Sequence, residues 1–267
     1  MEEKDLSFVL RHYKKGRLDT QQAIRLFRQR TRQGRQRKAW RAMAVAATVA
    51  AIIAAGATLW FKPMADKGVT VEAGSVAEAC TLPDGSRITL SPGTAISYSP
   101  TDMEQGRRAV ELKGTAYFEV KHNPRRPFTV SGNGAVVKVL GTKFQIEQAA
   151  SGSSTVYVAD GSVLFGRKGE GGAVALSSGM KALLDKGKQH PQIIPPGSAN
   201  QTSWATRIFV FDNTPVNEAL GDLSAFYKVN LTASDSTQRI TGTFEADDLN
   251  TIISVMGSTL GIKIRKE

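Results

Sequence analysis

Apolar and polar residues alternate in short runs through residues 68–190, which is the pattern of half-buried β-strands. Eight runs are clear, at residues 87–90, 109–112, 117–120, 128–130, 136–140, 143–146, 155–158 and 162–165. Dipeptides typical of turns separate them, among them Asp84-Gly85, Asn133-Gly134 and Asp160-Gly161. Because no long helical pattern lies between the runs, we expect a mainly-β domain over residues 68–195, built as a sandwich, a barrel or a stacked solenoid.

The pattern changes after residue 200. Residues 209–213 are typical of a strand, residues 214–227 carry apolar positions at helical spacing, and a short strand follows. We expect Thr214 to cap this helix and Pro215 to occupy its first position. The unit recurs 33 residues later at seven matched positions, which pair Phe211 with Phe244, Val216 with Leu249, Leu220 with Ile253, Leu223 with Met256, Tyr227 with Leu260, Val229 with Ile262 and Leu231 with Ile264. The duplication predicts a compact α/β domain of β-α-β–β-α-β type over residues 204–267.

Residues 42–61, AMAVAATVAAIIAAGATLWF, contain no charged side chain. A helix of this length is about 30 Å long, which matches the hydrocarbon core of a bilayer. A signal peptide and a buried core helix are the alternatives. However, the preceding 41 residues are longer than a usual leader, and the stretch has almost no polar face. The sequence therefore predicts one transmembrane helix over residues 42–61.

Positive charge is concentrated before this span. Residues 1–41 hold 13 Lys and Arg against 4 Asp and Glu, whereas residues 62–267 hold 22 against 20. Because basic flanks stay in the cytoplasm, we expect the N-terminus inside the cell and residues 62–267 outside it. The Arg-rich run at 28–41 then sets topology and meets anionic lipid, and its alternative role is DNA binding.

The cytoplasmic arm, residues 1–41, is expected to contain two short helices between residues 5 and 33. Its apolar positions follow helical spacing and are too few to bury much area on their own. We therefore expect them to contact a helical protein partner, although a self-packed helical hairpin is an alternative. These positions are Leu6, Val9, Leu10, Tyr13, Ile24 and Phe27.

The sequence offers little chemistry. Its three histidines stand at no zinc-ligand spacing, and no nucleophile or nucleotide-binding motif is present. Cys80 is the only cysteine, so we expect it to be a small buried apolar side chain. Asp247 and Asp248 are expected to cap the last helix. We predict no enzymatic activity, no catalytic residues, no cofactor and no metal site.

The stretch AYFEVKHNPRRPFTV, residues 116–130, places a basic loop between two strand patterns. We call this loop, residues 121–127, the knot. Pro124 and Pro127 restrict the backbone, and Tyr117, Val120, Phe128 and Val130 are expected to anchor the flanking strands in a core. We expect Arg125 and Arg126 to turn the corner between the strands. The alternative is a charged rim that faces a protein partner.

Short motifs follow one another along the exported region. They are Leu-Pro-Asp-Gly-Ser at 82–86, Tyr-Phe-Glu-Val at 117–120, Arg-Pro-Phe-Thr-Val at 126–130 and Val-Leu-Gly-Thr-x-Phe at 139–144. In this order they resemble the FecR family of bacterial anti-sigma regulators, and the region from Trp204 to Pro215 is similar to the C-terminal part of that family. The motif positions are Leu82, Pro83, Asp84, Gly85, Phe118, Arg126, Pro127, Phe128, Gly141, Thr142 and Phe144.

The resemblance implies a single-pass inner-membrane protein of a cell-surface signalling system. Its cytoplasmic arm would bind an extracytoplasmic-function sigma factor, and its periplasmic region would sense the signalling domain of a TonB-dependent receptor. The C-terminal domain would be STN-like, a type common in Bacteroidetes. Signal release in the family involves proteolysis that ends inside the membrane, and an intramembrane protease would be a further partner here. A membrane-tethered DNA-binding regulator and an envelope scaffold are the alternative functions.

Overall fold

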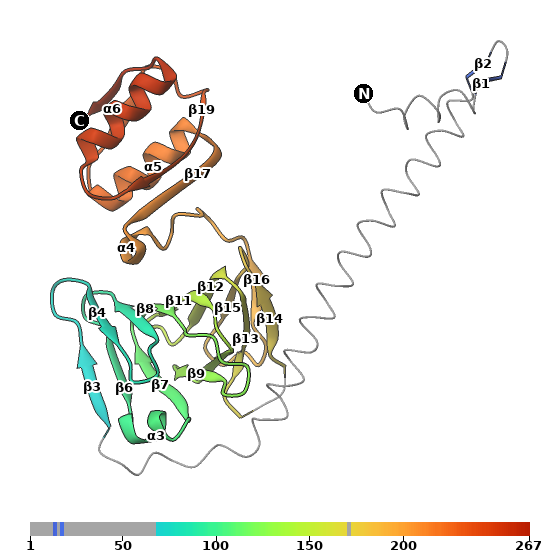
Figure 1. Cartoon of the computed structure of the whole chain (residues 1–267), viewed down its shortest axis with the longest axis vertical. Coiled ribbons are helices and arrows are strands. Elements are labelled where there is room, and N and C mark those ends of the chain that lie inside the picture. The colour runs from blue at the N-terminus through green and yellow to red at the C-terminus, as the bar shows by residue number, and fades with distance from the viewer. Residues whose placement is uncertain (1–12, 15–16, 19–67, 170–171) are drawn as a thin grey trace. The chain divides into compact units, whose positions relative to one another are not determined.

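Figure 1 shows a computed structural model of the chain, which describes residues 13–14, 17–18, 68–169 and 172–267. The chain divides into two compact units, Met1–Ala55 and Gly56–Glu267. The predicted span at 42–61 and most of the arm lie outside the described residues. Within the described ranges, no helix has both the length and the apolar character needed to cross a bilayer.

Two seven-stranded sheets form the body of the protein, from β3 to β16. In spatial order, the first sheet consists of β14 (Val174–Ser177), β13 (Ser162–Arg167), β10 (Ala135–Val139), β9 (Phe128–Gly132), β7 (Arg108–Lys113), β6 (Ala95–Tyr98) and β3 (Val69–Glu72). The second sheet consists of β16 (Gln192–Ile194), β15 (Lys181–Leu184), β12 (Ser154–Asp160), β11 (Lys143–Gln148), β8 (Thr115–Glu119), β5 (Arg87–Leu90) and β4 (Glu78–Thr81). A short helix, α3 (Pro100–Glu104), precedes β7.

The chain builds both sheets at once, because successive strands pass back and forth between them. The strands β4 and β5 belong to the second sheet, β6 and β7 to the first, and later hairpins extend each sheet in the same direction. Of the ladders described in the two sheets, only β7–β9 is parallel. This exception arises because β8 lies in the other sheet, so residues 120–127 carry the chain back to begin β9. The result is a two-sheet sandwich that grows in the manner of a solenoid.

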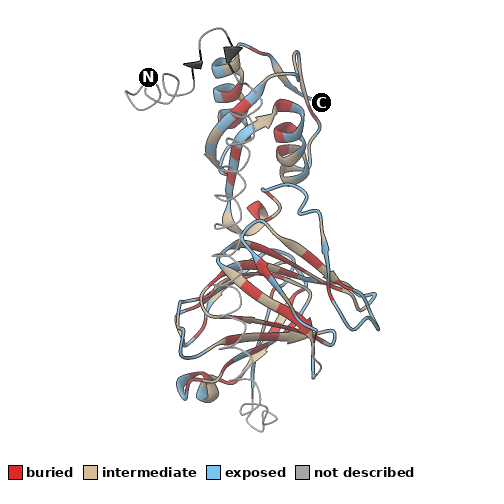
Figure 2. Cartoon of the chain, turned by 90° about the vertical axis from the view of Figure 1, so that its right-hand side faces the viewer, coloured by how far each residue is buried: buried red, intermediate tan, exposed pale blue. Residues whose placement is uncertain are grey.

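Burial alternates along the strands as the sequence pattern predicts (Figure 2). Along β7 the three inward residues are buried and the three outward residues are exposed. The inward side chains of both sheets form one apolar cluster. Of the expected anchors of the knot, Val120, Phe128 and Val130 belong to this cluster. Tyr117 is buried too, but outside the cluster, so its expected place in the core is wrong.

Residues 208–266 form two helices and two small sheets. The strand β17 (Ile208–Pro215) pairs with β19 (Arg239–Glu245), and β18 (Leu231–Ala233) pairs with β20 (Ile264–Lys266), both in the antiparallel sense. The helices α5 (Val216–Tyr227) and α6 (Leu249–Leu260) bury their apolar faces in one core with these strands. Both α5 and α6, and β18 and β20, are offset by 33 residues, which is the spacing of the repeat in the sequence.

The predicted start of α5 is wrong by one residue. Pro215, and not Thr214, is the N-cap, and no side chain caps this helix. The reason is that β17 continues to Pro215, where Thr214 pairs with Ile240 and accepts a hydrogen bond from the Asp212 N–H through Oγ1. The second helix starts as expected, because the Asp248 carboxylate accepts from the Asn250 and Thr251 N–H groups. The Thr251 hydroxyl, which donates to Asp248 Oδ2 at 2.7 Å, and these N–H groups hold the pKa of Asp248 below its usual range.

All eight predicted β-runs of the body are strands, but the sequence pattern missed β3, β4, β6, β14, β15 and β16. These strands are only three or four residues long, which is too short for alternation to be distinctive. The prediction that Tyr13 belongs to a helix is also wrong, because β1 (Tyr13–Lys14) pairs with β2 (Arg17–Leu18). Gly16 lies between them in the sequence and favours a chain reversal over a continuing helix.

Equivalent core residues of the duplicated domain provide a test. Leu223 in α5 and Met256 in α6 are both fully buried. Leu223→Ala and Met256→Ala should each lower the free energy of unfolding by about 2–5 kcal/mol, because each leaves a cavity. Val255→Ala on the exposed face should change it by less than about 0.5 kcal/mol. Denaturant unfolding measures all three, and a core variant as stable as the Val255 variant would contradict the equivalence.

Candidate functional site

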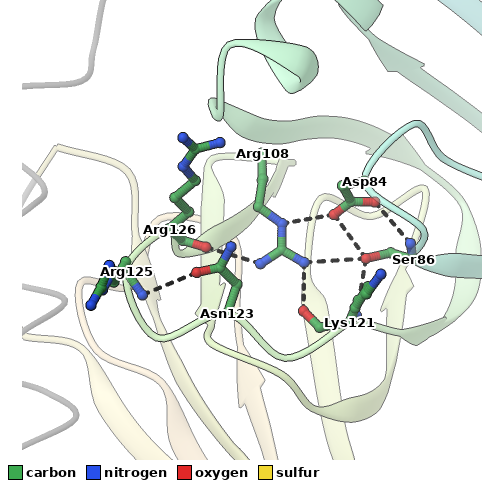
Figure 3. A network of polar contacts seen from close by, with 7 residues as sticks. All are labelled: Asp84, Ser86, Arg108, Lys121, Asn123, Arg125 and Arg126. Atoms are coloured by element: carbon green, nitrogen blue, oxygen red, sulfur yellow. Dashed lines mark hydrogen bonds and ion pairs between the residues drawn. The ribbon is translucent and has the colours of Figure 1, made fainter.

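The most connected polar group of the body is the buried guanidinium of Arg108, at the start of β7 (Figure 3). Its Nε donates to Asp84 Oδ2 at 2.7 Å, and its Nη1 donates to the Arg126 carbonyl at 2.9 Å. Its Nη2 donates to the Lys121 carbonyl at 2.6 Å and to Ser86 Oγ at 3.3 Å. Each of the three nitrogens thus has an acceptor, which is the condition for burying a charge at tolerable cost.

The turn at 82–86 positions the partners of Arg108. The Gly85 N–H donates to the Leu82 carbonyl, and Gly85 has a φ of +82°, a conformation that favours glycine. The Asp84 carboxylate accepts from the Ser86 N–H and from the Ser86 hydroxyl, both at 2.8 Å. The Ser86 hydroxyl in turn accepts from the Lys121 N–H at 3.1 Å. The turn and the knot are therefore tied together through one arginine and one serine.

The knot contributes backbone carbonyls to this network and leaves its charged side chains outside. Lys121, His122, Arg125 and Arg126 are all exposed. Asn123 shapes the loop, because its Oδ1 accepts from the Arg125 N–H and its own N–H donates to the Leu140 carbonyl. The interpretation of the knot as a connection between strands is confirmed, since residues 120–127 join β8 of one sheet to β9 of the other. A charged rim for a protein partner stays a prediction.

Three phenylalanines from the family motifs meet beneath the arginine. Phe118 and Phe144 stack with centroids 5.0 Å apart, and Phe118 contacts Phe128 edge to face at 6.3 Å. The Arg108 guanidinium lies 5.4 Å from the centre of the Phe128 ring. Since Arg108 is paired with Phe128 in the parallel ladder, the ladder itself places the cation over the ring.

Other motif residues allow close approaches at the same connection. A Cβ at Gly141 would lie 2.4 Å from the His122 Cα, so the knot excludes any larger residue there. Thr142 is buried, and its hydroxyl donates to the Ser162 carbonyl at 2.8 Å. The structure thus brings Asp84, Phe118, Phe128 and the Gly141-Thr142 pair to one junction, whereas the side chains of Pro83 and Arg126 are exposed.

The Arg108 network and the aromatic cluster beneath it are suited to a structural role. Within the described part of the chain, no group of His, Cys, Asp and Glu side chains could hold a metal ion. Burial raises the pKa of the Cys80 thiol, and the nearby Glu78 raises it further, so the thiol stays protonated and weakly nucleophilic at neutral pH. Burial, with smaller contributions from Glu119 and Asp160, raises the pKa of Tyr117 to about 12.

Comparison with known proteins identifies this architecture. The family profile described as "FecR protein" matches residues 67–164, and the profile described as "FecR, C-terminal" matches residues 208–267. Together the two matches cover more than half of the chain. The chain belongs to the FecR family. The prediction made from the motifs is confirmed, and the first matched region contains the whole network around Arg108.

Two crystal structures of a candidate anti-sigma factor from Parabacteroides distasonis are also similar to this FecR-family chain. One is 24% identical, covers 74% of this chain and 95% of its own, and has a TM-score of 0.47. The other is 23% identical, covers 75% and 95%, and has the same TM-score. These likenesses are too distant to carry a function across. A search of curated proteins found no match.

Trp204 precedes the second matched region and lies in the short helix α4 (Ser203–Thr206). Its indole N–H donates to Gln145 Oε1 of β11 at 2.7 Å. Nearby, Lys181 Nζ donates to Gln201 Oε1 at 2.9 Å. Cross-strand pairing puts Tyr117, Gln145 and Tyr157 side by side on the outer face of the second sheet. The segment from 201 to 204 is therefore bonded to that face, which explains a tryptophan in an otherwise polar linker.

Sequence reasoning did not single out Arg108, although a signal for it exists. Positions 108, 110 and 112 lie on the inward face of β7, where Val110 and Leu112 are apolar. A lone arginine on such a face implies a buried partner carboxylate, and Asp84 in the turn at 82–86 is that partner. The proposed sigma-binding residues Leu6, Val9, Leu10, Ile24 and Phe27 lie outside the described residues.

The network predicts a clear difference between two arginines. Arg108→Met should lower the free energy of unfolding by about 3–5 kcal/mol, because it leaves the buried Asp84 carboxylate without its cation. Arg107→Met removes the more exposed pair with Asp102 and should cost at most about 1 kcal/mol. Unfolding of both variants in denaturant gives the comparison, and equal losses would contradict the role assigned to Arg108.

Proposed function

We propose that this FecR-family chain is an anti-sigma regulator, a protein that controls transcription by binding a sigma factor. The observation that carries the proposal is the joint match of the two family profiles on residues 67–164 and 208–267. The fold is consistent with it, because the described residues form a two-sheet body and a small α/β domain. Such a region is suited to recognising a protein.

The sigma-binding part of the proposal rests on the N-terminal arm. Leu6, Val9 and Leu10 at helical spacing, with Ile24 and Phe27 further on, give an apolar surface too small for a core of its own. An extracytoplasmic-function sigma factor is the partner that the family assigns to such an arm. The correction at Tyr13 shortens the first predicted helix and leaves Leu6, Val9 and Leu10 as its apolar face.

The membrane part of the proposal rests on the charge pattern. The uncharged stretch at 42–61 would cross the inner membrane once, with the Arg-rich run at 28–41 on the cytoplasmic side. The body and the C-terminal domain would then lie in the periplasm. There they would receive a signal from the signalling domain of a TonB-dependent outer-membrane receptor, and the exposed basic side chains of the knot are a candidate contact.

Signal release would occur by regulated proteolysis within the span. Ala47, Ala51 and Ala55 recur every four residues, and alanine contributes little to insertion, so this helix would be only moderately anchored. An intramembrane protease would cut such a helix more readily than a Leu-rich one. Cleavage would free the arm together with its bound sigma factor.

Substitution in the arm tests sigma binding. Leu10→Asp and Phe27→Asp should each reduce the amount of sigma factor that co-purifies with the tagged chain by at least about tenfold, because each places a charge in an apolar contact. Gln29→Asp, which adds the same charge at a polar position of the arm, should leave the amount unchanged. Quantitative mass spectrometry of the purified complexes measures this. A sigma factor retained equally by all three variants would contradict the proposed surface.

Lengthening the side chains of the span tests proteolysis. In inducing conditions, an N-terminally tagged chain should give a shorter membrane-released fragment on a blot. The triple variant Ala47→Leu, Ala51→Leu and Ala55→Leu should give at least about fivefold less of it, because leucine strengthens membrane insertion. A single full-length band for the unmodified chain under all conditions would rule cleavage out.

A further inference from the structure

The strand β19 has one neighbour and one open side. It pairs with β17 alone, in a two-stranded sheet (Figure 1). In that ladder Ile208 faces Glu245 and Val210 faces Thr243. Because the Val210 and Ile208 N–H groups donate elsewhere, these are the pairs that exchange no backbone hydrogen bonds. The backbone groups of Thr243 and Glu245 therefore point away from β17, toward the open side.

The two outer edges of this sheet differ in how they are protected. On the β17 edge, the Val210 N–H donates to Asn200 Oδ1 at 2.7 Å, and the Ile208 N–H donates to Thr206 Oγ1 at 3.3 Å. On the β19 edge, no residue within the described part of the chain covers the backbone in this way. Lysine, proline and β-bulges are the usual features that keep an edge strand from pairing with another chain. The strand β19 contains neither Lys nor Pro, and the register irregularity of the sheet lies on β17.

The sequence of β19 is complementary to itself. When a second copy lies antiparallel so that all seven residues overlap, the two-fold axis passes through Gly242. Arg239 of each copy then faces Glu245 of the other, and Thr241 faces Thr243. By the alternation along the strand, Arg239, Thr241, Thr243 and Glu245 all direct their backbone groups to the open edge, so this register also satisfies the hydrogen-bonding pattern.

The side chains agree with this register. Arg239, Thr241, Thr243 and Glu245 are all exposed on the outer face. Arg239 Nε donates to the Asn213 carbonyl at 2.7 Å and to Asn213 Oδ1 at 3.0 Å. These bonds fix the guanidinium through Nε and leave its two terminal nitrogens available as donors to a carboxylate. Glu245 takes part in no ion pair of the described residues. Opposite charges facing each other across an antiparallel pair stabilise it, and like charges destabilise it.

We propose that β19 is a homodimerisation edge, where two copies of this chain join their two-stranded sheets into one four-stranded sheet about Gly242. Dimerisation is favourable because an isolated two-stranded sheet has marginal stability, and the pairing gives hydrogen-bond partners to the open backbone groups of both copies. The occupant is a second copy, since the strand supplies both members of the charge pair. The inference goes beyond sigma regulation and does not depend on it.

Charge exchange in the full-length chain tests the proposal. Arg239→Glu and Glu245→Arg each place like charges opposite one another at both ends of the interface and should weaken the dimer by roughly fivefold or more. Mixing the two single variants, or combining both changes in one chain, restores opposite charges and should restore the dimer. Arg265→Glu, on the exposed strand β20, is the matched control and should not weaken it. Chemical crosslinking of full-length chains in membranes provides the measurement.

Cysteine pairs test the register. In a Cys80→Ser background, differently tagged chains with Thr241→Cys and Thr243→Cys should form a disulfide-linked dimer when expressed together. Either variant expressed alone should give several-fold less of it, because its two thiols are displaced along the strands. A monomeric chain, a dimer unaffected by the charge reversals and not restored by exchange, or equal crosslinking of single and mixed variants would each overturn the proposal.

Discussion

The two-sheet body depends on one buried cation. Arg108 begins the only parallel pairing described in the two sheets, and its guanidinium draws in the turn at 82–86 through Asp84 and Ser86. The same guanidinium holds the knot by the carbonyls of Lys121 and Arg126. The place where the chain changes sheets is thus fixed by hydrogen bonds to a charge, which are stronger and more directional than apolar contacts.

This constraint gives the family motifs a physical meaning. Asp84 neutralises the arginine, Phe128 lies under it, and Phe118 and Phe144 extend the aromatic cluster into the core. Gly141 leaves room for the knot. The motifs by which the FecR family is recognised therefore maintain one strand connection. The charged side chains of Arg125 and Arg126 are exposed and take no part in this network.

The sequence predicted the parts of this fold whose signals are local. Alternation located eight strands of the body, all but β5 longer than four residues, and the 33-residue repeat located the duplicated domain. It missed six other strands of three or four residues, whose pairing is decided by neighbours distant in the chain. The sequence pattern placed Thr214 at a helix start, because the residues around Thr214 do not show that it pairs with Ile240 in the β17–β19 ladder. The role of Arg108 could not be predicted for the same reason, because its partner Asp84 lies 24 residues away in the sequence.

We propose that this FecR-family chain regulates a sigma factor through residues 1–41. The most direct measurement is genome-wide transcription in cells that carry the full chain and in cells that carry a chain lacking those residues. The account predicts that a set of promoters sharing one sigma-factor recognition sequence changes in activity, while transcription elsewhere stays constant. Identical transcription in both cells, with the shortened chain present at the same level, would contradict it.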